Sequence, residues 1–106
     1  MATNTREVVE GAQVQGEDES IRYSVDWSAL GGQESALPSS PVVVVKVEGS
    51  DVTTAVMPVN APIISGSEVI LSPLLGLTAG LVYRVEVRVN IGSNVLESYF
   101  MVTAQV

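Results

Sequence analysis

The chain has 106 residues, the length of one domain with a single core, and it contains no cysteine and no histidine. These two absences remove disulfides, zinc–thiolate sites and the most common general base, so we expect a protein that is not an enzyme and holds no cofactor or metal. A net charge of −7 argues against nucleic acid as a partner, and no apolar run approaches the roughly 20 residues that span a membrane.

Residues 1–19 are polar, acidic and interrupted by glycine, which predicts an N-terminal arm in front of a domain at 20–106. Two interpretations of this segment stay open. It is either an arm that orders against a neighbouring subunit or a first strand that packs on its own domain. The acidic run at 17–19 lacks the spaced ligands of a calcium loop and is interpreted as a solvated charge run. The candidate protein contacts in this segment are Val8, Val9 and Val14.

Two strands with clear periodicity come first in the domain. Apolar and polar residues alternate over 21–27, which predicts a half-buried strand with the single tryptophan, Trp27, in the core. After a loop over 33–41, a nearly continuous valine run predicts a second strand over 42–48. The residues expected to face inward are Ile21, Tyr23, Val25 and Trp27 on the first strand and Val43, Val45 and Val47 on the second.

The middle of the chain predicts shorter elements. A short strand is expected over 52–56. Pro58 and Pro62 confine the region that follows to a sheet edge or a crossing between sheets, because proline cannot donate a hydrogen bond to a β-ladder. Another short strand is expected over 68–72. No 3.6-residue period appears, so the fold is predicted to be all-β.

The clearest strand begins at Tyr83, from which apolar and polar residues alternate. Leu77 and Gly80 precede this tyrosine by six and three residues. That spacing resembles the tyrosine corner of immunoglobulin-like and fibronectin type III sandwiches, in which the hydroxyl bonds back to the preceding corner. We therefore expect an immunoglobulin-like or fibronectin type III-like antiparallel β-sandwich. Its corner and core are predicted to involve Leu77, Gly80, Tyr83 and Trp27.

The last two strands can be placed in register from their turn. Gly92 and Ser93 suit a two-residue turn, which puts Arg88 opposite Glu97 on the outer face. The same register directs Val95, Tyr99 and Met101 outward in a row. Tyrosine and methionine are enriched at interfaces, so we predict that this row contacts another protein, with ordinary exposed residues as the alternative. The remaining predicted pairs are Ile91 with Asn94, Val89 with Leu96, Val87 with Ser98, Val85 with Phe100 and Tyr83 with Val102.

Two groups could be considered catalytic, and neither meets the chemical requirements. Asp26 and Glu34 would need a cleft that holds sugar rings and raises the pKa of one carboxyl group, and a small sandwich is not expected to provide it. Ser39 and Ser40 have no base to activate them.

The segment Tyr-Ser-Val-Asp-Trp-Ser at 23–28, the valine strand, the corner at 77–83 and the closing hairpin together resemble small immunoglobulin-like structural proteins of tailed bacteriophages. The resemblance covers residues 21–103. It implies a virion component without enzymatic activity, assembled in the host cytoplasm. The role it implies is a capsid decoration or cement protein that binds the major capsid protein and forms a homo-oligomer such as a trimer. A neck or tail protein, and a carbohydrate-binding or adhesion module, are the alternatives.

Overall fold

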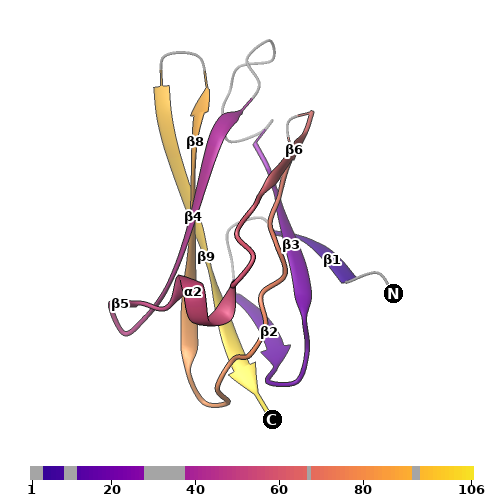
Figure 1. Cartoon of the computed structure of the whole chain (residues 1–106), viewed down its shortest axis with the longest axis vertical. Helices are drawn as coiled ribbons and strands as arrows, with labels where there is room; N and C mark the ends of the chain where they lie inside the picture. Colours follow the sequence, from indigo (N-terminus) through magenta and orange to yellow (C-terminus); the bar gives the residue numbers. More distant parts are fainter. Residues whose placement is uncertain (1–3, 9–11, 28–37, 67, 92–93) are drawn as a thin grey trace.

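The computed structural model describes residues 4–8, 12–27, 38–66, 68–91 and 94–106. Within these ranges the strands form a four-stranded sheet in the order β1-β3-β7-β6 and a five-stranded sheet in the order β2-β9-β8-β4-β5 (Figure 1). The predicted all-β fold is confirmed. The elements are β1 (Asn4–Val8), β2 (Ala12–Gly16), β3 (Ile21–Asp26), β4 (Ser39–Val47), β5 (Ser50–Asp51), α2 (Thr53–Val56), β6 (Ile63–Ser65), β7 (Glu68–Ile70), β8 (Val82–Ile91) and β9 (Asn94–Gln105).

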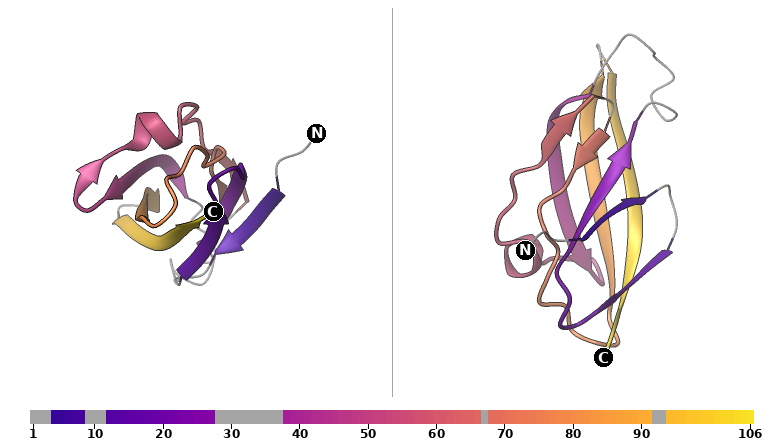
Figure 2. Two further views of the ribbon diagram at one scale, coloured as in Figure 1. Left: turned by 90° about the horizontal axis from the view of Figure 1, so that it is seen from below. Right: turned by 90° about the vertical axis from the view of Figure 1, so that its right-hand side faces the viewer.

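The two sheets face each other and enclose the core between them (Figure 2). Every second side chain of the long strands points into this layer, as the two-residue period requires. Tyr23 of β3 meets Phe100 of β9 across the core, with ring centroids 5.1 Å apart. The predicted inward residues of β3 and β4 are buried, except Val47, which is partly buried against the core.

Strand β4 begins earlier than the sequence predicted. Ser39, expected in a loop, pairs with Asn90, and the register then shifts before Val42. Ser40 has a φ of +50° at this irregularity. A shift of register leaves a position without a ladder partner, which explains how Pro41 lies inside a strand. The predicted loop from 33 to 37 lies outside the described residues.

The strand predicted over 52–56 is wrong, because residues 53–56 form the single helical turn α2. A side-chain network favours this turn: the Thr53 backbone N–H and hydroxyl both donate to Asp51 Oδ1, at 2.9 and 2.7 Å. The Thr53 hydroxyl oxygen also accepts from the Val45 N–H at 2.8 Å. The chain then crosses to β6, an edge strand of the other sheet. This agrees with the prediction from Pro58 and Pro62 that the region lies at a sheet edge or in a crossing between sheets.

Tyr83 is bonded to the segment that precedes it, and the final hairpin has the predicted register. Tyr83 is buried, and its hydroxyl oxygen accepts a hydrogen bond from the Thr78 N–H at 2.9 Å. Gly80 has a φ of +93°, a conformation that glycine adopts without strain. All predicted pairs between β8 and β9 are confirmed, from Ile91 with Asn94 to Tyr83 with Val102. The turn residues 92–93 themselves lie outside the described part of the chain.

The described part of residues 1–19 belongs to the two sheets. β1 pairs in parallel with β3, and β2 pairs in parallel with β9. Gln15 of β2 is fully buried, and its Nε2 donates to the Leu74 carbonyl at 2.7 Å. Residues 4–8 and 12–16 thus pair within their own chain, as the second of the two interpretations of this segment expects. A buried amide with its partners in the same chain explains why the polar segment is held there.

Candidate functional site

The outward side chains of β4, β8 and β9 form one continuous surface on the five-stranded sheet, called here the outer face. Alternation places them there, because the intervening residues of all three strands are buried in the core, except Leu96, which is partly buried against it. They are Val42, Val44 and Lys46 of β4, Arg84, Glu86 and Arg88 of β8, and Val95, Glu97, Tyr99 and Met101 of β9.

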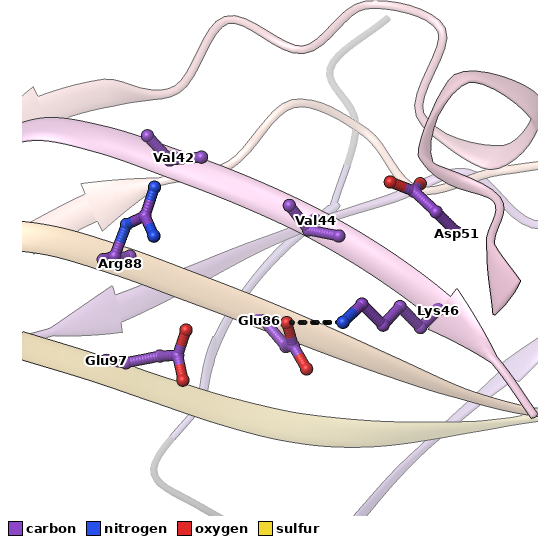
Figure 3. Close-up of a pocket in the computed structure, with 7 residues that line it drawn as sticks. All are labelled: Val42, Val44, Lys46, Asp51, Glu86, Arg88 and Glu97. Atoms are coloured by element: carbon purple, nitrogen blue, oxygen red, sulfur yellow. Dashed lines mark ion pairs between the residues drawn. The ribbon is translucent and has the colours of Figure 1, made fainter. Parts of the chain in front are cut away.

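Glu86 lies at the centre of a charged network on the outer face. Its carboxylate is 3.7 Å from Lys46 Nζ, an ion pair that Figure 3 shows. The same carboxylate is 2.9 Å from Arg84 Nε. The Arg84 guanidinium carbon lies 3.7 Å above the centre of the Tyr99 ring, which is a cation–π contact. Ion pairs at such exposure contribute little to stability. Through Arg84, the ion pair with Glu86 is connected to the Tyr99 ring.

A hollow of about 390 Å³ lies on the outer face beside this network. Small-molecule sites are lined mainly by apolar and aromatic side chains, whereas this hollow is lined mainly by charged groups of both signs. Hydrogen bonds to Asp51 from the side chain and then the backbone of Thr53 hold the pKa of its carboxyl below the ordinary value, so this group is charged at neutral pH. The lining residues are Val42, Val44, Lys46, Asp51, Glu86, Arg88 and Glu97 (Figure 3).

The predicted row on β9 lies on the outer face, though unevenly exposed. Val95 is 65% exposed and Tyr99 is 43% exposed, while Met101 is only partly exposed. Met101 pairs with Ala12 of β2, so the row ends where β2 joins the sheet. Arg88 and Glu97 are opposite each other as predicted, but the ion pairs within the described residues of this face use Glu86 instead.

The structure also brings a predicted contact from the N-terminal segment to the same face. Val14 of β2 pairs with Thr103 of β9, whose alternation with buried Val102 and Ala104 directs it outward. Val14 is 48% exposed and therefore extends the outer face beyond Met101. Val8 lies in β1 of the other sheet, paired with Val25, and Val9 lies outside the described residues. Strand β2 thus brings Val14 of the N-terminal segment onto the same face as the row on β9. The alternation of residues in the sequence does not show which strand lies beside which, so it could not predict this.

One exposed residue of the outer face was not singled out from the sequence. Val42 is 42% exposed at the start of the regular part of β4. The signal was present, because Val43 and Val45 were predicted to point inward and Val42 must then point outward. In a run of four valines, however, the outward members carry no chemical mark that distinguishes them.

The remaining candidate groups have structural roles or lie elsewhere. Glu19, from the acidic run, accepts a hydrogen bond from the Gly16 N–H at 2.7 Å and closes the turn after β2. Ser39 donates to the Asn90 carbonyl oxygen at 3.3 Å. Glu34, which was considered with Asp26 as a catalytic pair and rejected, lies outside the described residues. Among the described residues, no group of three acidic, histidine or cysteine side chains could hold a metal, and no helix is long and apolar enough to span a membrane.

No protein-family model matches the chain, and no curated protein matches it. The functional argument therefore rests on the chemistry of the outer face.

Proposed function

We propose that this is a non-enzymatic structural protein that binds other proteins through the outer face. The observation that carries the proposal is the gathering of exposed apolar side chains from three strands, Val14, Val42, Val95 and Tyr99, on one side of the sheet. Exposed apolar residues on a sheet face are typical of contacts with other proteins. Charged residues such as Arg88 and Glu97 lie between them and add polar groups to the same surface.

An immunoglobulin-like relationship is part of this proposal. In immunoglobulin sandwiches one sheet has strands A, B, E and D and the other has G, F and C. The order β1-β3-β7-β6 against β9-β8-β4 corresponds to that pattern. The hydrogen bond between the Tyr83 hydroxyl and the Thr78 N–H supports it as well. The parallel pairings of β1 with β3 and of β2 with β9 depart from it, because sheets of this class are antiparallel.

Within this role we propose a virion protein of a tailed bacteriophage, a capsid decoration or cement protein that binds the major capsid protein as a homo-oligomer. The support is the resemblance of residues 21–103, together with an outer face available for lattice contacts. The segment at 1–19 gives no support as a free arm, because its described part pairs within the chain. A neck or tail position is the alternative within the same particle.

Nothing in the described residues favours a carbohydrate-binding module. Such a site stacks sugar rings on exposed aromatic side chains, and Tyr99 was the outward candidate. The Arg84 guanidinium already covers one side of that ring at 3.7 Å.

Co-sedimentation with heads of the phage that encodes the protein tests the proposal. The double variant Val42→Asp/Val95→Asp places charges at two exposed positions of the outer face, so it should still fold. It should bind the phage heads at least about tenfold more weakly than the parent does. The control, Val59→Asp, makes the same change at an exposed valine in the segment before β6 and should bind as the parent does. Equal binding of both variants would remove the outer face from the contact. A parent protein that binds neither heads, necks nor tails would refute the virion role.

A further inference from the structure

Strand β9 is longer than its partner on one side. It runs from Asn94 to Gln105, while β2 pairs only with Met101 to Gln105. Figure 1 shows β2 beside the C-terminal end of β9 alone. Among the described residues, the part of β9 at 94–100 therefore has β8 on one side and no strand on the other. This part is called here the open edge.

Printed hydrogen bonds establish which backbone groups point toward the open edge. The Ala104 N–H donates to the Leu81 carbonyl at 2.9 Å, and the Ala104 carbonyl accepts from the Gly80 N–H at 3.0 Å, so Ala104 faces the β8 side. The Gln105 carbonyl accepts from the Glu17 N–H at 2.7 Å and faces the β2 side. Backbone direction alternates along an antiparallel strand whose register with β8 is unbroken. The N–H and C=O groups of Val95, Glu97 and Tyr99 therefore point to the open edge.

The side chains of these three residues have a simple pattern. Two exposed apolar residues, Val95 and Tyr99, flank the exposed carboxylate of Glu97 at equal distances along the strand. The ion pairs of the outer face use Glu86, so within the described residues the Glu97 carboxylate has no cation within 4 Å. An added strand would thus meet an apolar residue, a negative charge and an apolar residue at successive outward positions.

Charge decides what the open edge accepts. A second copy that paired antiparallel along the whole of 94–100 would be centred on Glu97 and would place the two Glu97 side chains opposite each other. Like charges directly opposite are destabilising, and the net charge of −7 adds to the repulsion. A charge on an exposed edge is also a common protection against self-pairing. A segment with a cation at this position gains from the same carboxylate.

We propose that the open edge of β9 binds an extended segment of a partner protein by strand addition, with Lys or Arg opposite Glu97 and apolar residues opposite Val95 and Tyr99. The backbone groups of the three edge residues supply the hydrogen bonds, and the alternate side chains supply the selectivity. This inference rests on the proposed function, because it specifies how a protein partner is held next to the outer face.

The probe is the synthetic peptide Thr-Val-Thr-Lys-Thr-Val-Thr, titrated into the full chain and followed by backbone NMR shifts. Its counterpart has Glu in place of Lys. The Lys peptide should bind about three- to tenfold more tightly than the Glu peptide and shift the amides of 95–99. Glu97→Lys should reverse the preference. Glu48→Lys changes the net charge equally at an exposed turn residue and should leave the preference unchanged.

Methylation of the peptide's alternate backbone nitrogens separates strand addition from simple charge attraction. A peptide methylated on the amides that face β9 should lose binding. Unchanged binding of that peptide, or a reversal by Glu48→Lys as large as by Glu97→Lys, would overturn the inference. So would dimerisation of the parent chain through residues 94–100 without peptide binding, which would identify a second copy as the occupant. If the parent chain binds phage particles but not the Lys peptide, strand addition is rejected and the virion role stands. If it binds the Lys peptide but not the particles, the virion role is rejected and strand addition stands.

Discussion

Replacement of Gln15 by leucine tests whether the N-terminal segment is an integral part of the domain. The Gln15 side chain is 0% exposed and joins three parts of the chain. Its Nε2 donates to the carbonyls of Leu74 and Glu19, at 2.7 and 3.0 Å, and its Oε1 accepts from the Tyr23 hydroxyl at 2.9 Å. Leucine has a comparable volume but can make none of these bonds, so the change isolates the polar network.

The expected cost follows from the burial of these hydrogen bonds. The bonds to Leu74 and Tyr23 are buried and the bond to Glu19 is partly buried. A buried hydrogen bond contributes about 1 kcal/mol, and a polar group left without its partner costs about 1 to 3 kcal/mol. We therefore expect Gln15→Leu to lower the free energy of unfolding by about 2 to 4 kcal/mol. In a domain of this size that corresponds to a fall in melting temperature of about 10 °C or more.

Urea unfolding followed by circular dichroism and by Trp27 fluorescence measures this change. The control is Gln13→Leu, on the same strand but half-buried and outside the network, which should change the free energy of unfolding by less than about 0.5 kcal/mol. If Gln15→Leu unfolds within that margin of the parent, β2 is not held by its buried amide. The assignment of residues 12–16 to the five-stranded sheet would then be refuted.

A chain that starts at Ser20 should be strongly destabilised or unfolded, because it lacks β1, β2 and the hydrogen bonds of Gln15. A cooperative melt close to that of the parent would show instead that residues 1–19 are dispensable for folding. Tyr83→Phe should cost about 1 to 2 kcal/mol by removing the acceptor of the Thr78 N–H, whereas the same change at exposed Tyr99 should cost little in the same denaturant melt. The pKa of Asp51 lies below its ordinary value of 3.8, chiefly because the Thr53 side chain donates a hydrogen bond to its carboxylate. The stabilisation that this carboxylate provides is therefore present above pH 3.8 and is lost as the pH falls through the pKa of the folded state. The difference in stability between the parent and Asp51→Asn should therefore shrink below about pH 3.8, and a difference that stayed constant down to pH 2 would contradict this assignment.

Local patterns in the sequence were sufficient for the strands whose partners are close in the chain. The register of β8 against β9 follows from one two-residue turn and the strict alternation of side chains, so Arg88 opposite Glu97 and Val85 opposite Phe100 could be derived without coordinates. The hydrogen bond from the Thr78 N–H to the Tyr83 hydroxyl also joins groups only five residues apart.

Interactions between distant residues decided the rest. The helical turn α2 depends on Thr53 meeting Val45 of a neighbouring strand, a contact that a short apolar run does not indicate. The N-terminal segment looked like an acidic arm because its composition is polar, yet the Gln15 amide binds the Leu74 carbonyl, 59 residues away in the chain. Within the described residues, the open edge of β9 ends where β2 begins, at Ala12 opposite Met101. A period of two predicts which face a side chain occupies, but which strand lies beside it depends on contacts across the whole chain.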